Sequence, residues 1–67
     1  MAAEFAVYVQ EDTGAMWKAS VTDLEEAKRR AKDLTRTEGL EAFVRSLQTY
    51  EEIARFFPSR QAGVIAG

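Results

Sequence analysis

The chain begins with two segments in which apolar and polar residues alternate, the pattern of half-buried β-strands. In residues 4–10, the apolar positions of one face are Phe5, Val7 and Val9. In residues 15–21, the positions of one face are Trp17, Ala19 and Val21. Between them, Asp12 and Gly14 suit a tight turn. The two segments are predicted to pair as an antiparallel hairpin, with Trp17 anchored in the core.

Residues 22–39 have the repeat of an amphipathic helix. Apolar residues recur at spacings of three and four, at Leu24, Ala27, Ala31 and Leu34. Thr22 can cap the first turn, and Glu25 can reach back to complete a capping box. Gly39 supplies the left-handed residue that commonly ends a helix. A helix is therefore predicted over this segment.

Residues 40–47 alternate again and predict a third strand. Leu40, Ala42 and Val44 would face the helix. Phe43 and Arg45 would both lie on the opposite face. If that face meets another subunit, we expect Phe43 to be largely buried only in the assembly. The alternative is a register shift of one residue, which would place Phe43 in the core of the single chain.

Residues 49–57 fit two structures. A strand would close a hairpin, but no Gly, Asn, Asp or Pro stands near Gln48 to make the turn. A helix is favoured by Thr49 and Glu52 at capping-box spacing, and Pro58 would end it. The helix is the preferred interpretation. Residues 58–67 show no period and are predicted to form a flexible tail.

These elements predict one α+β domain over residues 1–57 with the order β-β-α-β-α. A right-handed crossover would set the third strand beside the first. The sheet would then be three-stranded and antiparallel with the order 2-1-3, and both helices would pack on one face. The alternative is ββαββ, if residues 50–57 form a strand.

Composition narrows the function classes. The 67 residues include neither cysteine nor histidine, so a disulfide is excluded and a zinc or haem site is not expected. No cofactor is predicted. Nine basic and eleven acidic residues give a net charge of −2, too balanced to favour nucleic acid or an anionic membrane as partner. No apolar run or basic leader indicates a membrane span or a signal, so a cytoplasmic protein is expected.

Two motifs could have either a functional role or an ordinary structural one. Asp12-Thr13-Gly14 matches the triplet of aspartic proteases, but Asp and Gly are ordinary turn residues and a three-residue match arises easily by chance. A basic cluster, which could meet phosphates, consists of Lys28, Arg29, Arg30 and Lys32. Glu25 and Glu26 precede Arg29 and Arg30 by four residues, so a solvated, self-neutralising helix face is the favoured account. Neither motif predicts an enzyme.

The strongest candidate for a functional surface is the sheet face turned away from the predicted helix. Six residues are assigned to it: Tyr8, Met16, Lys18, Phe43, Arg45 and Leu47. A small domain with large apolar residues on both sheet faces is predicted to bind protein, and the favoured hypothesis is a non-enzymatic homodimer that associates through this face or an edge strand. The alternative is nucleic-acid binding, because aromatic and basic residues on an open sheet can stack on bases.

One family resemblance bears on the alternative. The hairpin with Tyr8 on its first strand, followed by the pattern T-x-x-E-E-A from Thr22 to Ala27, resembles the start of HicB-type antitoxins. The glycine-containing strand typical of those proteins is missing before the helix. The resemblance implies a small regulatory protein, and it covers about thirty residues of the chain.

Overall fold

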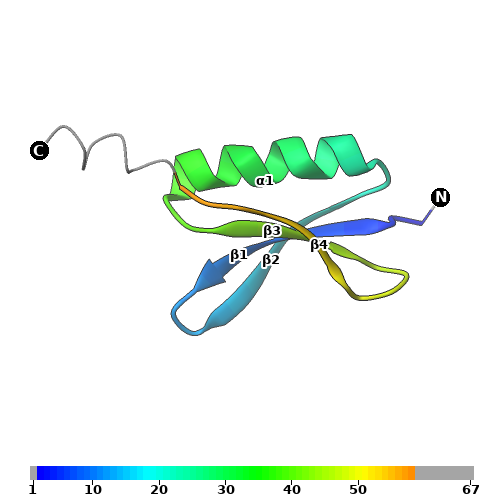
Figure 1. The fold of residues 1–67 in the computed structure, drawn as a ribbon, viewed down its shortest axis with the longest axis horizontal. Coiled ribbons are helices and arrows are strands. Elements are labelled where there is room, and N and C mark those ends of the chain that lie inside the picture. Colours follow the sequence, from blue (N-terminus) through cyan, green and yellow to red (C-terminus); the bar gives the residue numbers. More distant parts are fainter. Residues whose placement is uncertain (1, 59–67) are drawn as a thin grey trace, which may run out of the picture.

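The computed structural model describes residues 2–58, which form one antiparallel sheet and one helix packed on it (Figure 1). The elements, in chain order, are β1 (Phe5–Glu11), β2 (Gly14–Val21), α1 (Leu24–Glu38), β3 (Ala42–Ser46) and β4 (Glu52–Phe56). The strands lie in the order β2-β1-β3-β4, and each neighbouring pair is antiparallel. Apart from Pro58, the predicted tail lies outside the described residues.

The α+β class and the placement of β3 beside β1 are confirmed, but the three-stranded sheet with two helices is wrong. Residues 52–56 form strand β4, so the ββαββ alternative describes the fold. β4 pairs with β3 and extends the predicted order 2-1-3 to four strands. α1 therefore covers the sheet without the second helix that was expected at its side.

The hairpin between β3 and β4 turns without glycine or proline because side chains replace them. The hydroxyl of Ser46 accepts hydrogen bonds from the backbone N–H groups of Gln48 and Thr49, each at 3.2 Å. The Thr49 hydroxyl accepts from the N–H of Glu51 at 3.3 Å. Tyr50 adopts the left-handed conformation, with φ of 65°. Serine and threonine hydroxyls are known to form such local turns, and here they outweigh the capping-box signal.

Capping residues determine where helix α1 begins and ends. Its N-cap is Asp23, whose carboxylate accepts a hydrogen bond from the N–H of Glu26 at 3.2 Å, so the prediction of Thr22 as the cap is one residue early. Gly39 ends the helix in the left-handed conformation, with φ of 69°, as predicted. Among the described residues, no helix is long and apolar enough to cross a membrane.

The main core lies between α1 and the sheet. Its buried members are Val7, Val9, Ala27, Ala31, Ala42 and Val44. The two alanines belong to the helix, and their small side chains let its backbone lie close to β1 and β3. The predicted apolar stripe of the helix therefore does face the sheet.

A β-bulge in β2 changes the predicted faces of that strand. Val7 in β1 pairs with Ala19, but the next residue, Tyr8, pairs with Trp17. Lys18 is the extra residue between these pairs, which is the definition of a bulge. Residues of β2 that precede Lys18 are therefore shifted by one position relative to a regular alternation.

The shift corrects three expectations. Cross-strand partners share a face, so Trp17 lies on the face turned away from α1 and not in the core beneath it. Met16, which pairs with Val9, lies on the α1 side of the sheet. Lys18 also turns to that side, where its ammonium forms an ion pair of 3.2 Å with Glu38.

Candidate functional site

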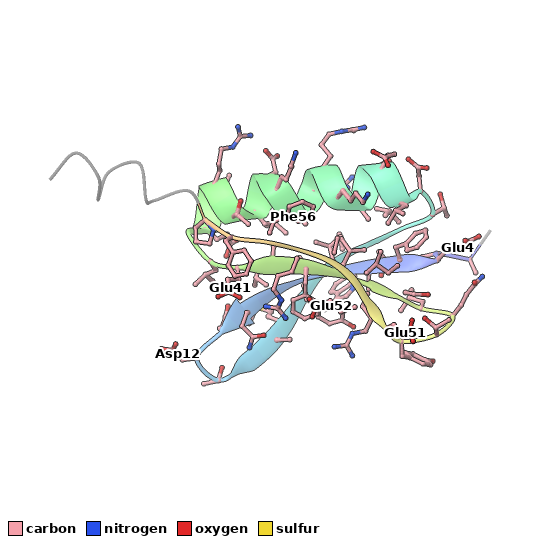
Figure 2. All side chains as sticks on the ribbon, viewed as in Figure 1. Glu4, Asp12, Glu41, Glu51, Glu52 and Phe56 are labelled. Atoms are coloured by element: carbon pink, nitrogen blue, oxygen red, sulfur yellow. The ribbon has the colours of Figure 1, made fainter. Side chains whose placement is uncertain are left out.

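The sheet face turned away from α1, called the open face below, carries a row of large side chains across all four strands. Strand pairing places them side by side in the order Trp17, Tyr8, Phe43 and Arg55. Arg45 belongs to the neighbouring row, between Ala6 and Glu52. Figure 2 shows Glu41 and Glu52 on this side of the sheet and Phe56 on the side of α1.

Aromatic stacking forms the centre of the open face. The rings of Tyr8 and Phe43 are 5.2 Å apart between centroids and inclined by 10°. Phe43 keeps only 2% of its surface exposed, although the main core lies on the opposite side of the sheet. The predicted face of Phe43 is right, but the expectation that it is buried only in an assembly is wrong, because side chains of the same chain cover it.

Two arginine side chains also cover the Phe43 ring. The guanidinium of Arg55 lies 4.6 Å from the centroid of the Phe43 ring. The guanidinium of Arg45 lies 5.6 Å from the Phe43 ring and 5.5 Å from the Tyr8 ring. Both are within the range of cation–π attraction. The aliphatic stems of long basic side chains also cover apolar surface, which explains how arginines can bury a phenylalanine.

Arg55 is held in place by two carboxylates. Its guanidinium donates to both carboxylate oxygens of Glu52 and, at 2.8 Å, to Glu41. The hydrogen bond from Arg55 lowers the pKa of Glu52 below the ordinary glutamate range, and Glu52 in turn raises the pKa of Arg55. Both groups therefore remain charged at neutral pH. Such a fixed triad positions Arg55 and leaves Glu52 unsuited to release and take up protons near neutrality.

Arg45 has a different environment. It is half-buried, and its Nε is buried without a hydrogen-bond partner anywhere in residues 2–58. A buried donor that lacks an acceptor is unfavourable. The open face thus contains one arginine with carboxylate partners and one whose hydrogen-bonding capacity is incompletely used.

Trp17 is the exposed end of the row. Its surface is 57% exposed, although its indole N–H donates to the hydroxyl of Ser20 at 2.9 Å. The hydrogen bond fixes one edge of the ring and leaves its apolar surface in contact with solvent. Trp17 is thus an apolar projection beside the Tyr8–Phe43 stack.

The structure brings together some of the six predicted surface residues. Tyr8, Phe43 and Arg45 are neighbours on the open face. Met16 and Lys18 are on the other side of the sheet for the reason given above. Leu47 follows the last residue of β3 and lies in the connection to β4, half-buried.

Sequence reasoning missed two members of this site. Trp17 was assigned to the core because a single bulge residue has no clear signature in an alternating pattern. Arg55 was missed because its segment was interpreted as a helix. A strand interpretation would have found it, since alternation from Ala54 and Phe56 places Arg55 on the face opposite to them.

Within residues 2–58, no three His, Cys, Asp or Glu side chains are arranged to hold a metal ion. Comparisons of the chain with protein-family models, curated protein sequences and solved structures found no match. The assignment of function therefore depends on the geometry of the site.

Proposed function

We propose that this protein is a small, non-enzymatic interaction module that self-associates through the open face of its sheet. The observation that best supports this proposal is the exposure of Trp17 beside the stacked rings of Tyr8 and Phe43. Tryptophan, tyrosine and arginine are the side chains that most often anchor protein interfaces, and this face carries all three types. Trp17 is the anchor of the proposed contact.

The charge of the open face favours a second copy as the partner. Arg45 and Arg55 are balanced by Glu41 and Glu52, so two copies of the face can meet without net repulsion. In a two-fold symmetric contact, each surface has to be complementary to itself.

Nucleic-acid binding is less well supported by the same face. Phe43 is buried beneath Tyr8, so it offers no ring surface for a base. Arg55 is neutralised by Glu41 and Glu52, which leaves Arg45 as the main cation that could meet a phosphate. The formal net charge of −2 adds to this disadvantage.

Sedimentation equilibrium from micromolar to millimolar concentration tests the proposal. The chain should convert reversibly from monomer to dimer, and Trp17→Ala should weaken the dimer by about 2 kcal/mol or more if Trp17 is a central anchor. Met16→Ala is the matched control, because Met16 is the adjacent exposed residue on the opposite side of the same strand. A monomer at every concentration, or equal losses in both variants, would refute association through the open face.

A further inference from the structure

A groove of about 550 Å³ lies between α1 and β4, on the opposite side of the sheet from the open face. Its lining consists of Glu25, Lys28, Arg29, Lys32, Ala54 and Phe56. The helix contributes the charged residues and β4 contributes the apolar floor. Figure 1 shows the C-terminal part of β4 running beside α1, and Figure 2 shows Phe56 on that side.

The basic residues of this groove differ from those elsewhere on the helix. Arg30 and Arg36, which do not line it, form close ion pairs with Glu26 at 3.1 Å and Asp33 at 2.6 Å. Within the groove, Lys28 reaches Glu25 only at 3.9 Å.

The predicted neutralisation of the basic cluster is thus incomplete. Arg29, expected to pair with Glu25, and Lys32 have no ion-pair partner within 4 Å in the part of the chain that the structure describes. Three cations therefore face one carboxylate in the groove. An anionic ligand would find an unmatched positive charge here.

Among residues 2–58, no strand pairs with the outer side of the strand beside the groove. β4 is the outermost strand, with β3 as its neighbour in the sheet. The backbone N–H and C=O groups on the outer side of an edge strand are available to an added strand. Phe56 offers apolar contact next to that edge, and the Lys32 ammonium lies 5.9 Å from its ring centroid.

We infer that the groove binds an extended acidic segment of a partner protein, which adds to β4 as a further strand. In strand addition, backbone hydrogen bonds at an open strand edge give affinity, and pockets beside that edge for alternate side chains give specificity. Here the pocket beside the edge has a positively charged lining and an apolar floor. Every second residue of the segment would be acidic, so that the acidic side chains all lie on the side that faces the helix. The site is distinct from the open face, so it does not depend on self-association.

The spacing of the lysines supports an extended ligand. Lys28 and Lys32 are four residues apart, which corresponds to a rise of about 6 Å along a helix. Side chains on one face of a strand repeat every two residues, or about 6.6–6.8 Å. A strand with the pattern acidic-x-acidic, lying along β4, therefore places one carboxylate near each lysine.

The test uses a short synthetic peptide in which glutamate alternates with threonine or valine. Its titration into the isotopically labelled protein, at low salt, should shift the amide signals of residues 54–57 and those around Lys28 and Lys32. A peptide with the same number of glutamates, spaced three residues apart so that neighbouring carboxylates fall on opposite faces of the strand, should bind several-fold less tightly. Trp17→Ala should leave the affinity unchanged.

Two charge variants provide the matched comparison. Lys28→Gln with Lys32→Gln should weaken binding about tenfold, because two charge-assisted contacts are removed. Arg30→Gln with Arg36→Gln removes the same charge from the same helix, but outside the groove, and should change the affinity by less than about twofold. Equal losses in the two variants would overturn the inference, since they would indicate diffuse attraction to the helix.

A backbone modification tests the added strand itself. N-methylation of alternate peptide amides removes hydrogen bonds on one edge of the peptide and keeps every charge. Methylation on one of the two edges should abolish binding, while methylation on the other edge should leave it intact. The inference fails if neither peptide is affected, if the unmodified peptide does not bind, or if inorganic tripolyphosphate binds at the same residues as tightly as the peptide.

Discussion

Tyr8 covers Phe43 in a near-parallel stack, with 5.2 Å between ring centroids. The pair gives the sheet a second buried layer on the side that α1 does not cover. Phe43 lies at the middle of this layer, between the ring of Tyr8 on β1 and the guanidinium of Arg55 on β4. The open face is therefore a packed surface with Trp17 exposed at one end.

Replacement of Phe43 by alanine should destabilise the single chain. Removing a buried phenylalanine ring costs about 3–5 kcal/mol, and Phe43 is among the most completely buried side chains. Urea unfolding at several protein concentrations measures the loss, which should not depend on concentration. A loss that appears only at high concentration would mean that Phe43 is buried by association and not by Tyr8 and Arg55.

Replacement of Tyr50 by glycine should stabilise the β3–β4 hairpin. Tyr50 has a positive φ and is 70% exposed, so its side chain contributes little burial while its backbone is strained. The left-handed conformation costs a non-glycine residue about 1–2 kcal/mol, and the added flexibility of glycine in the unfolded chain offsets about 0.5–1 kcal/mol of the gain. A net increase of about 0–1.5 kcal/mol in unfolding free energy is expected. A decrease would show that the Tyr50 side chain has a stabilising contact.

Ser46→Ala should weaken the same hairpin. The hydroxyl of Ser46 accepts from two backbone N–H groups, and Ser46 is only 8% exposed. Loss of a comparable capping hydroxyl costs about 0.5–2 kcal/mol. Thermal or urea unfolding gives the value, and Thr49→Ala, which removes one longer and more exposed hydrogen bond, is the comparison with the smaller expected effect. Equal effects would contradict the role assigned to Ser46.

The ion pair between Glu52 and Arg55 should make stability depend on pH in the acid range. Because Arg55 lowers the pKa of Glu52 in the folded chain, the pair stabilises the fold above the unfolded-state pKa of glutamate, about 4.3, and this stabilisation is lost as pH falls through the lower folded-state pKa. The difference in unfolding free energy between wild type and Glu52→Gln should therefore shrink from neutral pH to about pH 3. A difference that stays constant would exclude this linkage.

Much of the fold follows from local signals in the sequence. The spacing of apolar residues predicts α1, and Gly39 ends it where expected, since a left-handed residue is needed there. The alternation in residues 4–10 and 40–47 places Val7 and Val44 toward the helix and Phe43 away from it, because β1 and β3 pair without interruption.

The remaining features depend on interactions that a pattern does not encode. Strand β4 was only the second choice for its segment because the turn before it uses the hydroxyls of Ser46 and Thr49, together with a strained Tyr50, in place of glycine. The exposed position of Trp17 was missed because Lys18 is inserted into the pairing with β1. Both errors changed the candidate site more than they changed the fold class.

The fluorescence of Trp17 offers the most direct test of association through the open face. Trp17 is the only tryptophan in the chain, and 57% of its surface is exposed in the single chain. If two open faces meet, its emission should shift to shorter wavelength and its quenching by acrylamide should decrease as protein concentration rises, following the dimer fraction from sedimentation. Emission and quenching that do not change with concentration while dimers form would contradict an interface at the open face.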